Sequence, residues 1–178
     1  MNARDTALVQ ESFKAVAALG EPVAELFYAE LFAIDPSLKQ MFKGDMLQQR
    51  KKLLAALAMV VRSLHAPEQI IGPAKALAVK HLDYGVEPVH YTYVGNALLR
   101  TLKKGLGDQF TPELRDAWVE AFRMLAGVMK DAAYGSESAT VRVQRNAASQ
   151  PDPDMRRGAR AASHRLMRSV APSRTGRC

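Results

Sequence analysis

Prolines divide the first 134 residues of the chain into segments of helical length. The prolines that carry this signal lie in the pairs Glu21-Pro22, Asp35-Pro36, Gly72-Pro73, Glu87-Pro88 and Thr111-Pro112. Proline fits the first turn of a helix but not its interior, and it disfavours the helical conformation at the residue before it. The segments between these pairs have helical periodicity and no alternating strand pattern. They predict an all-α fold without internal repeats.

These signals predict six helices, or seven if a short turn after Pro36 is counted. We expect the six at about residues 6–19, 21–35, 45–64, 73–82, 88–104 and 112–133. Asp45 is the predicted N-cap of the third helix, and Gln48 lies three residues later, where its side chain can complete a capping box. A chain of this length can bury a substantial hydrophobic core.

The positive charge of the chain lies in its last 44 residues. From residue 135 onward there are nine arginines against three acidic residues, which leaves the first 134 residues with a net charge of only +1 out of a total of +7. This tail is rich in Ser, Ala, Arg and Pro and has no aromatic residue, so it holds too little apolar surface to offset its ordering entropy. We therefore predict a folded domain at 1–134 and a disordered basic tail at 135–178. Neither nucleic acid nor a membrane is an expected partner of the folded domain.

The sequence favours a cytoplasmic location. The single cysteine is the last residue, Cys178, which excludes an internal disulfide. The longest apolar run, Leu53–Val61, is far shorter than the roughly 20 residues that cross a bilayer. Charged residues at Arg4, Asp5 and Glu11 interrupt the segment in which a secretory signal would need apolar residues.

Two polar residues lie on apolar helix faces. On a helical wheel Gln49 aligns with Leu53 and Val60, and His81 aligns with Leu77. A buried polar group is costly unless it is hydrogen-bonded, so each side chain either satisfies the protein backbone or meets a polar ligand. Taken alone, each is more often structural.

Several segments of the chain occur together, in order and spacing, in one known family. They read ELFYAELFAIDPSLKQMF, KGDMLQQRKKLLAAL, AVKHLDYGVEPVHYTYVGNALL, AWVEAF and LAGVM. Over about residues 5–134 the chain resembles the single-domain bacterial haemoglobins and the globin domain of flavohaemoglobins. The resemblance implies a globin fold with haem b between the helix that carries Gln49 and the helix that carries His81.

The resemblance also assigns roles to individual residues. It implies that His81 is the proximal ligand of the haem iron, with its second ring nitrogen donating to the carbonyl oxygen of Leu77 one turn earlier. On the opposite side of the haem, Tyr28 and Gln49 match the distal polar residues that stabilise bound O2. The matching residues of the haem surroundings are Phe42, Leu53, Tyr91, Val94 and Leu98.

The other histidines are weaker candidates. His90 falls in the first turn of a helix, where the helix dipole disfavours its protonation, and we expect a partly exposed packing residue. His65 and His164 have no visible partner in the sequence and are expected to face solvent.

Two departures from the family pattern bear on enzyme activity. In flavohaemoglobins a glutamate near the end of the last helix increases electron donation by the proximal histidine; Ala133 stands at that position, and Phe122 stands where many relatives have tyrosine. The sequence also lacks the strand, glycine loop and helix pattern of a flavin or nicotinamide domain. Any catalytic turnover is therefore expected to need an external reductase.

Three functions remain open from the sequence. The first is reversible O2 binding for storage or transport, and the second is a nitric oxide dioxygenase in which NO reacts with bound O2; CO is a further possible ligand. The third is a haem-based sensor or interaction protein that acts through the tail, where Met155, Ala159, Ala162, Leu166 and Val170 would share one face of a basic helix. The sequence does not distinguish a monomer from a homodimer.

Overall fold

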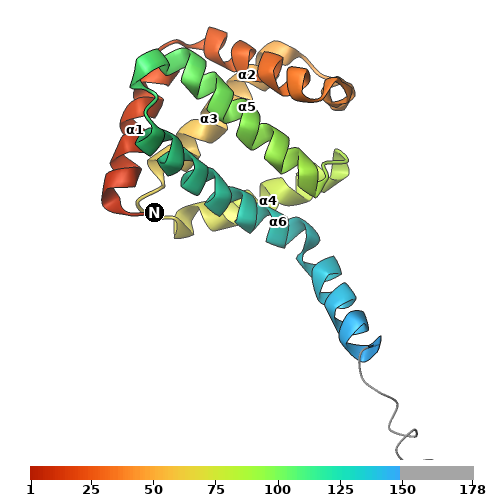
Figure 1. Cartoon of the computed structure of the whole chain (residues 1–178). Helices are drawn as coiled ribbons and strands as arrows, with labels where there is room; N and C mark the ends of the chain where they lie inside the picture. Colours follow the sequence, from red (N-terminus) through yellow and green to blue (C-terminus); the bar gives the residue numbers. More distant parts are fainter. Residues whose placement is uncertain (149–178) are drawn as a thin grey trace, which may run out of the picture. The chain divides into compact units, whose positions relative to one another are not determined.

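A computed structural model of the chain describes residues 1–148, with side-chain surroundings for residues 1–135. Within that range the structure consists of helices and their connections, which confirms the all-α prediction (Figure 1). In chain order they are α1 (Ala3–Ala17), α2 (Glu21–Ile34), η1 (Pro36–Met41), α3 (Met46–Arg62), α4 (Glu68–Asp83), α5 (Pro88–Leu106), η2 (Gly107–Gln109) and α6 (Pro112–Ala148). The chain divides into the units Met1–Gly135 and Ser136–Cys178. None of the described helices is both long and apolar enough to cross a membrane.

Three helices start at the prolines that predicted them. Pro22, Pro88 and Pro112 lie in the first turns of α2, α5 and α6. Helix α1 begins earlier than predicted, at Ala3, because Asn2 and Asp5 form a capping box in which each side chain accepts the backbone N–H of the other residue. Asp45 caps α3 as predicted.

The predicted capping box at Asp45 is not the arrangement in the structure. The Asp45 carboxylate accepts the backbone N–H of Leu47 at 2.8 Å, and the structure has a simple N-cap there in place of a reciprocal pair with Gln48. The exposed Gln48 side chain is not needed for this cap.

The predicted start of the fourth helix at Pro73 is wrong. Helix α4 begins at Glu68, and Pro73 lies inside it. A proline there removes one hydrogen bond of the helix, yet Ile70, Ala74 and Ala78 are buried at four-residue spacing on one face. The burial of this apolar face against the rest of the protein outweighs the local proline signal.

Helix α6 is longer than predicted. It starts at Pro112 as expected but continues to Ala148, past the predicted end near residue 133. The sequence holds no proline between Pro112 and Pro151 that would interrupt the helix. The rest of the predicted tail, with His164 and the apolar face from Met155 to Val170, lies outside the described residues.

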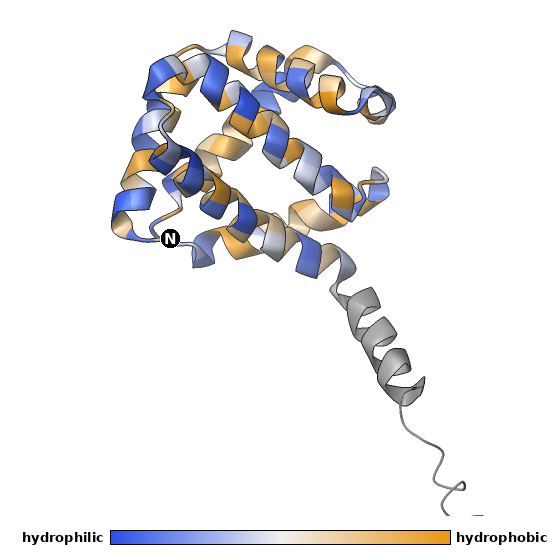
Figure 2. Ribbon diagram, viewed as in Figure 1, coloured by the Kyte–Doolittle hydropathy of each residue, from blue (hydrophilic) through white to orange (hydrophobic). Residues whose placement is uncertain are grey.

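Two hydrophobic clusters form the core of the unit Met1–Gly135. The larger cluster joins α1, α2, α5 and α6 around residues such as Val9, Leu31, Leu102 and Trp118. The smaller one joins α4, α5 and α6 and includes Tyr91. In Figure 2 apolar and polar residues alternate along the helices at the spacing of amphipathic helices. Residues of both clusters line one cavity.

Candidate functional site

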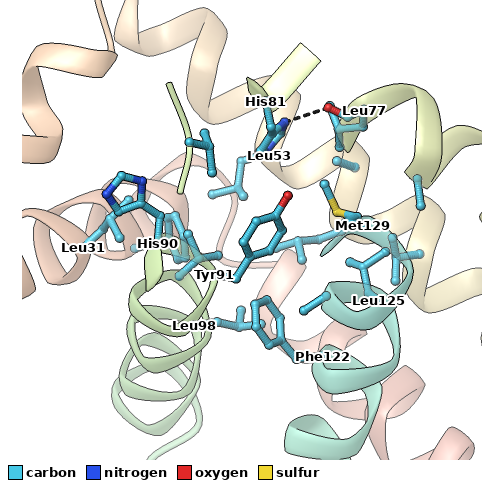
Figure 3. Close-up of a pocket in the computed structure, with 18 of the residues that line it drawn as sticks. Leu31, Leu53, Leu77, His81, His90, Tyr91, Leu98, Phe122, Leu125 and Met129 are labelled. Atoms are coloured by element: carbon cyan, nitrogen blue, oxygen red, sulfur yellow. Dashed lines mark hydrogen bonds between the residues drawn. The ribbon is translucent and has the colours of Figure 1, made fainter. Parts of the chain in front are cut away.

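One cavity of about 240 Å³ is lined by residues from α2 through α6 (Figure 3). Its wall is almost entirely apolar, and His81, His90 and Tyr91 supply the polar side chains. The apolar lining residues are Phe27, Leu31, Leu38, Met41, Phe42, Leu53, Ala56, Leu57, Met59, Val60, Ile70, Pro73, Ala74, Leu77, Val86, Val94, Leu98, Phe122, Leu125, Ala126 and Met129. Such a wall suits a mostly apolar ligand that meets a few polar groups.

His81 is fixed by a hydrogen bond along its own helix. Its Nδ1 lies 2.9 Å from the carbonyl oxygen of Leu77, as the sequence predicted. Because a carbonyl can only accept, Nδ1 carries the hydrogen and the lone pair of the neutral ring is on Nε2. Burial lowers the pKa of His81 below its ordinary value, with the hydrogen bond to Leu77 acting in the opposite direction. The ring is therefore neutral at physiological pH and can bind a metal through Nε2.

Tyr91 places an unpaired hydroxyl group beside His81. The two ring centroids are 6.4 Å apart with the planes tilted by 28°, and the Tyr91 side chain points from α5 toward His81 and Met129 (Figure 3). The hydroxyl is buried and has no hydrogen-bond partner among the described residues. Burial raises the pKa of Tyr91 to about 12, with a smaller contribution from Tyr134. This hydroxyl is neutral and can pair with a polar atom of a ligand or with water.

His90 lies in the first turn of α5 and helps to cap that helix. Its Nδ1 accepts the backbone N–H of Glu87 at 3.0 Å, and the half-buried ring lines the cavity as well. The partial burial of His90 was therefore predicted correctly, but its hydrogen bond to the Glu87 N–H was not predicted. His65 is exposed, as expected.

Tyr28 lies in an aromatic cluster next to the cavity. Its ring centroid is 5.3 Å from those of Phe27 and Phe42, and both of these neighbours line the cavity. Burial raises the pKa of Tyr28, while a hydrogen bond with the Gln49 side chain lowers it. An amide N–H of Gln49 can donate to the Tyr28 oxygen, and a hydroxyl that accepts in this way still has its own hydrogen to donate.

The predicted site residues fall into two groups. Phe42, Leu53, Leu77, His81, Tyr91, Val94 and Leu98 all line the cavity. Tyr28 and Gln49 pair with each other as neighbours in space, but neither is part of the cavity wall.

The sequence reasoning missed the part of the wall that α6 supplies. Phe122, Leu125 and Met129 lie at the spacing of one helix face and all reach the cavity. That periodicity marks them as buried, but it does not say which buried residues meet a ligand.

The family model for globins matches residues 25–129, more than half of the chain. The chain is a globin. A flavohemoprotein of Deinococcus radiodurans is 35% identical over 126 residues, which are 69% of this globin and 31% of the relative. A flavohemoprotein of Xylella fastidiosa is 32% identical over 127 residues, or 70% of this globin and 32% of the relative. The globin thus spans about a third of the length of these relatives.

Solved structures of other globins share the fold. An engineered carbene transferase from Rhodothermus marinus, provisionally described as a nitric oxide dioxygenase, has a TM-score of 0.69 at 25% identity and covers 79% of this globin and 99% of its own chain. A bacterial globin from Campylobacter jejuni has a TM-score of 0.66 at 22% identity, and the match covers 77% of this globin and 99% of the Campylobacter chain. A flavohemoglobin from Malassezia yamatoensis with bound FAD and heme has a TM-score of 0.63 at 20% identity, and the match covers 78% of this globin and 38% of the Malassezia chain.

The family assignment supports the haem cofactor predicted from the sequence, and the cavity fits it. The wall is apolar, and a neutral histidine presents its Nε2 as a possible iron ligand. Haem brings its own four nitrogen ligands, so a single histidine is enough to hold its iron.

Proposed function

We propose that this globin binds haem b through His81 and uses it to bind O2 reversibly. The observation that carries the proposal is the His81 ring, oriented by Leu77 and neutral, at the wall of an apolar cavity. When bound there, the haem supplies an iron with one coordination position open to O2, CO or NO.

The cavity wall has a role in keeping the site dry. Phe42, Leu53 and Leu98 place aromatic and branched aliphatic groups at the cavity from three separate segments of the chain. An apolar wall disfavours water and charged species, and these residues would thereby slow the oxidation of a haem iron held there. The same wall favours small uncharged ligands.

Tyr28 and Gln49 are proposed as the distal hydrogen-bonding pair. In this proposal the Gln49 amide donates to the Tyr28 oxygen, and the Tyr28 hydroxyl hydrogen would be available to the partial negative charge of O2 bound at the haem. Tyr28 is next to the cavity, since its ring contacts Phe27 and Phe42, which both line it. In this arrangement Gln49 acts through Tyr28 by polarising its hydroxyl.

A nitric oxide dioxygenase is the second candidate, and the similarity to the Rhodothermus marinus protein favours it. This activity requires an electron donor, so the proposed partner is an external reductase. Consumption of NO with formation of nitrate, in the presence of O2 and a reductase, would separate this activity from simple O2 binding. The sensor hypothesis concerns tail residues outside the described part.

Absorption spectroscopy tests the proposal directly. The purified protein should show a Soret band with distinct deoxy, O2 and CO forms, and its absence after reconstitution with hemin would refute haem binding. His81→Ala should lose haem or change its ligation. His90→Ala is the matched control, because His90 lines the same cavity but uses Nδ1 to accept the N–H of Glu87. A normal spectrum in His81→Ala and an altered one in His90→Ala would reassign the ligand.

A further inference from the structure

A lysine from α6 lies over the ring of Tyr91. The Nζ atom of Lys130 is 5.5 Å from the centroid of that ring, a distance at which the negative face of an aromatic ring attracts an ammonium group. Lys130 is half-buried, and it forms no ion pair among the residues whose side chains the structure describes. The residues three and four positions away along α6 are Ala126, Gly127, Ala133 and Tyr134, and none carries a carboxylate. In this part of the chain no carboxylate within ion-pair distance thus compensates the charge of Lys130.

Tyr91 in turn faces the proposed iron ligand. Its ring centroid is 6.4 Å from that of His81, and in Figure 3 the Tyr91 side chain points toward His81. Since the two contacts share the Tyr91 ring, Nζ of Lys130 lies within about 12 Å of the His81 ring centre, a range over which charges interact appreciably in an apolar interior. Tyr91 and Met129 are both buried, so salt and water screen a charge here less than they would at the surface.

The surroundings of His81 supply no charge that would cancel this one. Among the described residues, the wall of the cavity contains no Asp, Glu, Lys or Arg. Burial raises the pKa of Tyr91 to about 12, with a smaller contribution from Tyr134, so the Tyr91 hydroxyl is neutral at physiological pH. Lys80 is next to His81 in the sequence, but it is exposed and solvent screens its charge. Of these two lysines, Lys130 therefore has the more direct electrostatic influence on His81.

We propose that Lys130 raises the reduction potential of the haem iron bound at His81. Oxidation from the ferrous to the ferric state adds one positive charge to the iron, and a fixed positive charge nearby opposes that change. Lys130 thereby keeps a larger fraction of the iron in the ferrous state, which is the state that binds O2. This inference rests on the proposed binding of haem through His81, and it requires no contact between Lys130 and the haem.

Lys130→Met tests the inference because it removes the charge and keeps a side chain of similar length. In a spectroelectrochemical titration of the full-length protein, the ferric-to-ferrous ratio at a fixed potential should be about threefold to tenfold higher in the variant, equivalent to a midpoint potential lower by about 30 to 60 mV. The upper value corresponds to a unit charge about 12 Å away at an effective dielectric constant of about 20, and the partial exposure of Lys130 reduces it.

Two control variants separate charge from packing. Lys130→Arg keeps a positive charge over the Tyr91 ring and should keep the parent potential. Lys103→Met makes the same change in charge at an exposed position of α5, about 18 Å along the helix from Tyr91, and should leave the potential unchanged. Raising the salt concentration from about 0.01 M to about 1 M should shrink the difference between the parent and Lys130→Met.

The outcomes decide between an electrostatic role and a structural one. An equal midpoint potential in the parent and in Lys130→Met would overturn the inference. A potential in Lys130→Arg as low as that in Lys130→Met would also overturn it, because packing of the lysine stem would then be the cause. If Lys130→Met does not hold haem, Lys130→Gln replaces it in the titration and the same two outcomes decide. A parent protein whose absorption spectrum shows no histidine-bound haem would instead refute the proposed function.

Discussion

Replacement of Tyr28 by phenylalanine should speed O2 dissociation strongly. The variant keeps the ring contacts with Phe27 and Phe42 and removes only the hydroxyl. A hydrogen bond to a charged acceptor contributes about 1.5 to 3 kcal/mol, so its loss corresponds to an increase on the order of tenfold to a hundredfold in the dissociation rate. Gln49→Leu should have a smaller effect, because in the proposed arrangement Gln49 donates to the neutral Tyr28 oxygen and not to O2 itself. A neutral hydrogen bond contributes about 0.5 to 1.5 kcal/mol, which corresponds to roughly twofold to tenfold.

Stopped-flow displacement of O2 by CO measures these rates. CO dissociation is the internal control, because CO is much less polarised on binding and its rate should change only slightly in either variant. The double variant Tyr28→Phe with Gln49→Leu should dissociate O2 no faster than Tyr28→Phe alone, since Gln49 acts through the missing hydroxyl. An O2 dissociation rate within about twofold of the parent in the double variant would leave less than about 0.5 kcal/mol for the pair and refute its donor role.

Three further predictions concern the scaffold of the site. The buried Trp118 indole N–H donates to the Ser12 hydroxyl at 3.0 Å. Ser12→Ala should therefore lower the free energy of unfolding, measured by chemical denaturation, by about 1 to 3 kcal/mol. An unchanged free energy of unfolding would mean that water replaces the hydroxyl. A Cβ at Gly95 would lie 2.8 Å from a Phe122 ring carbon, so Gly95→Ala should lower the thermal midpoint of unfolding. The double variant Gly95→Ala with Phe122→Leu should recover part of the loss. An unchanged midpoint in Gly95→Ala would show that the Phe122 ring moves freely. Because the cavity lies within the first unit, truncation after Gly135 should leave the haem spectrum unchanged, and a displaced Soret band would contradict this.

The position of His81 could be predicted from the sequence because two independent signals agree on it. Helical periodicity places it on the face of Leu77, and the family resemblance places it opposite Gln49. The hydrogen bond to Leu77 follows from helix geometry alone, since residues four apart are neighbours on a helix. Local rules were less reliable for the helix caps, since the capping box predicted at Asp45 is absent and the hydrogen bond from the Glu87 N–H to His90 was not predicted.

Local sequence rules could not predict interactions between segments that are distant in the sequence. The contact of Tyr134 with Val86 depends on how closely α6 approaches the end of α4, and nothing in either segment alone specifies that distance. The start of α4 was misplaced for a related reason, because burial against other helices overrode the signal at Pro73. Likewise the contact of Tyr28 with Phe42 follows from the packing of α2 against the segment that contains Phe42.

Residues of five consecutive α-helices form the wall of the cavity. For this reason the supply of the cofactor affects the abundance of the protein. Every helix from α2 to α6 contributes lining residues, so partial unfolding of any one of them opens the site. A ligand that binds only the folded state adds its binding free energy to stability, about 2.7 kcal/mol at a concentration one hundred times its Kd. In a cell short of haem, a larger fraction of this globin would be unfolded and exposed to proteases. The amount of the protein would then follow the amount of haem without any change in transcription.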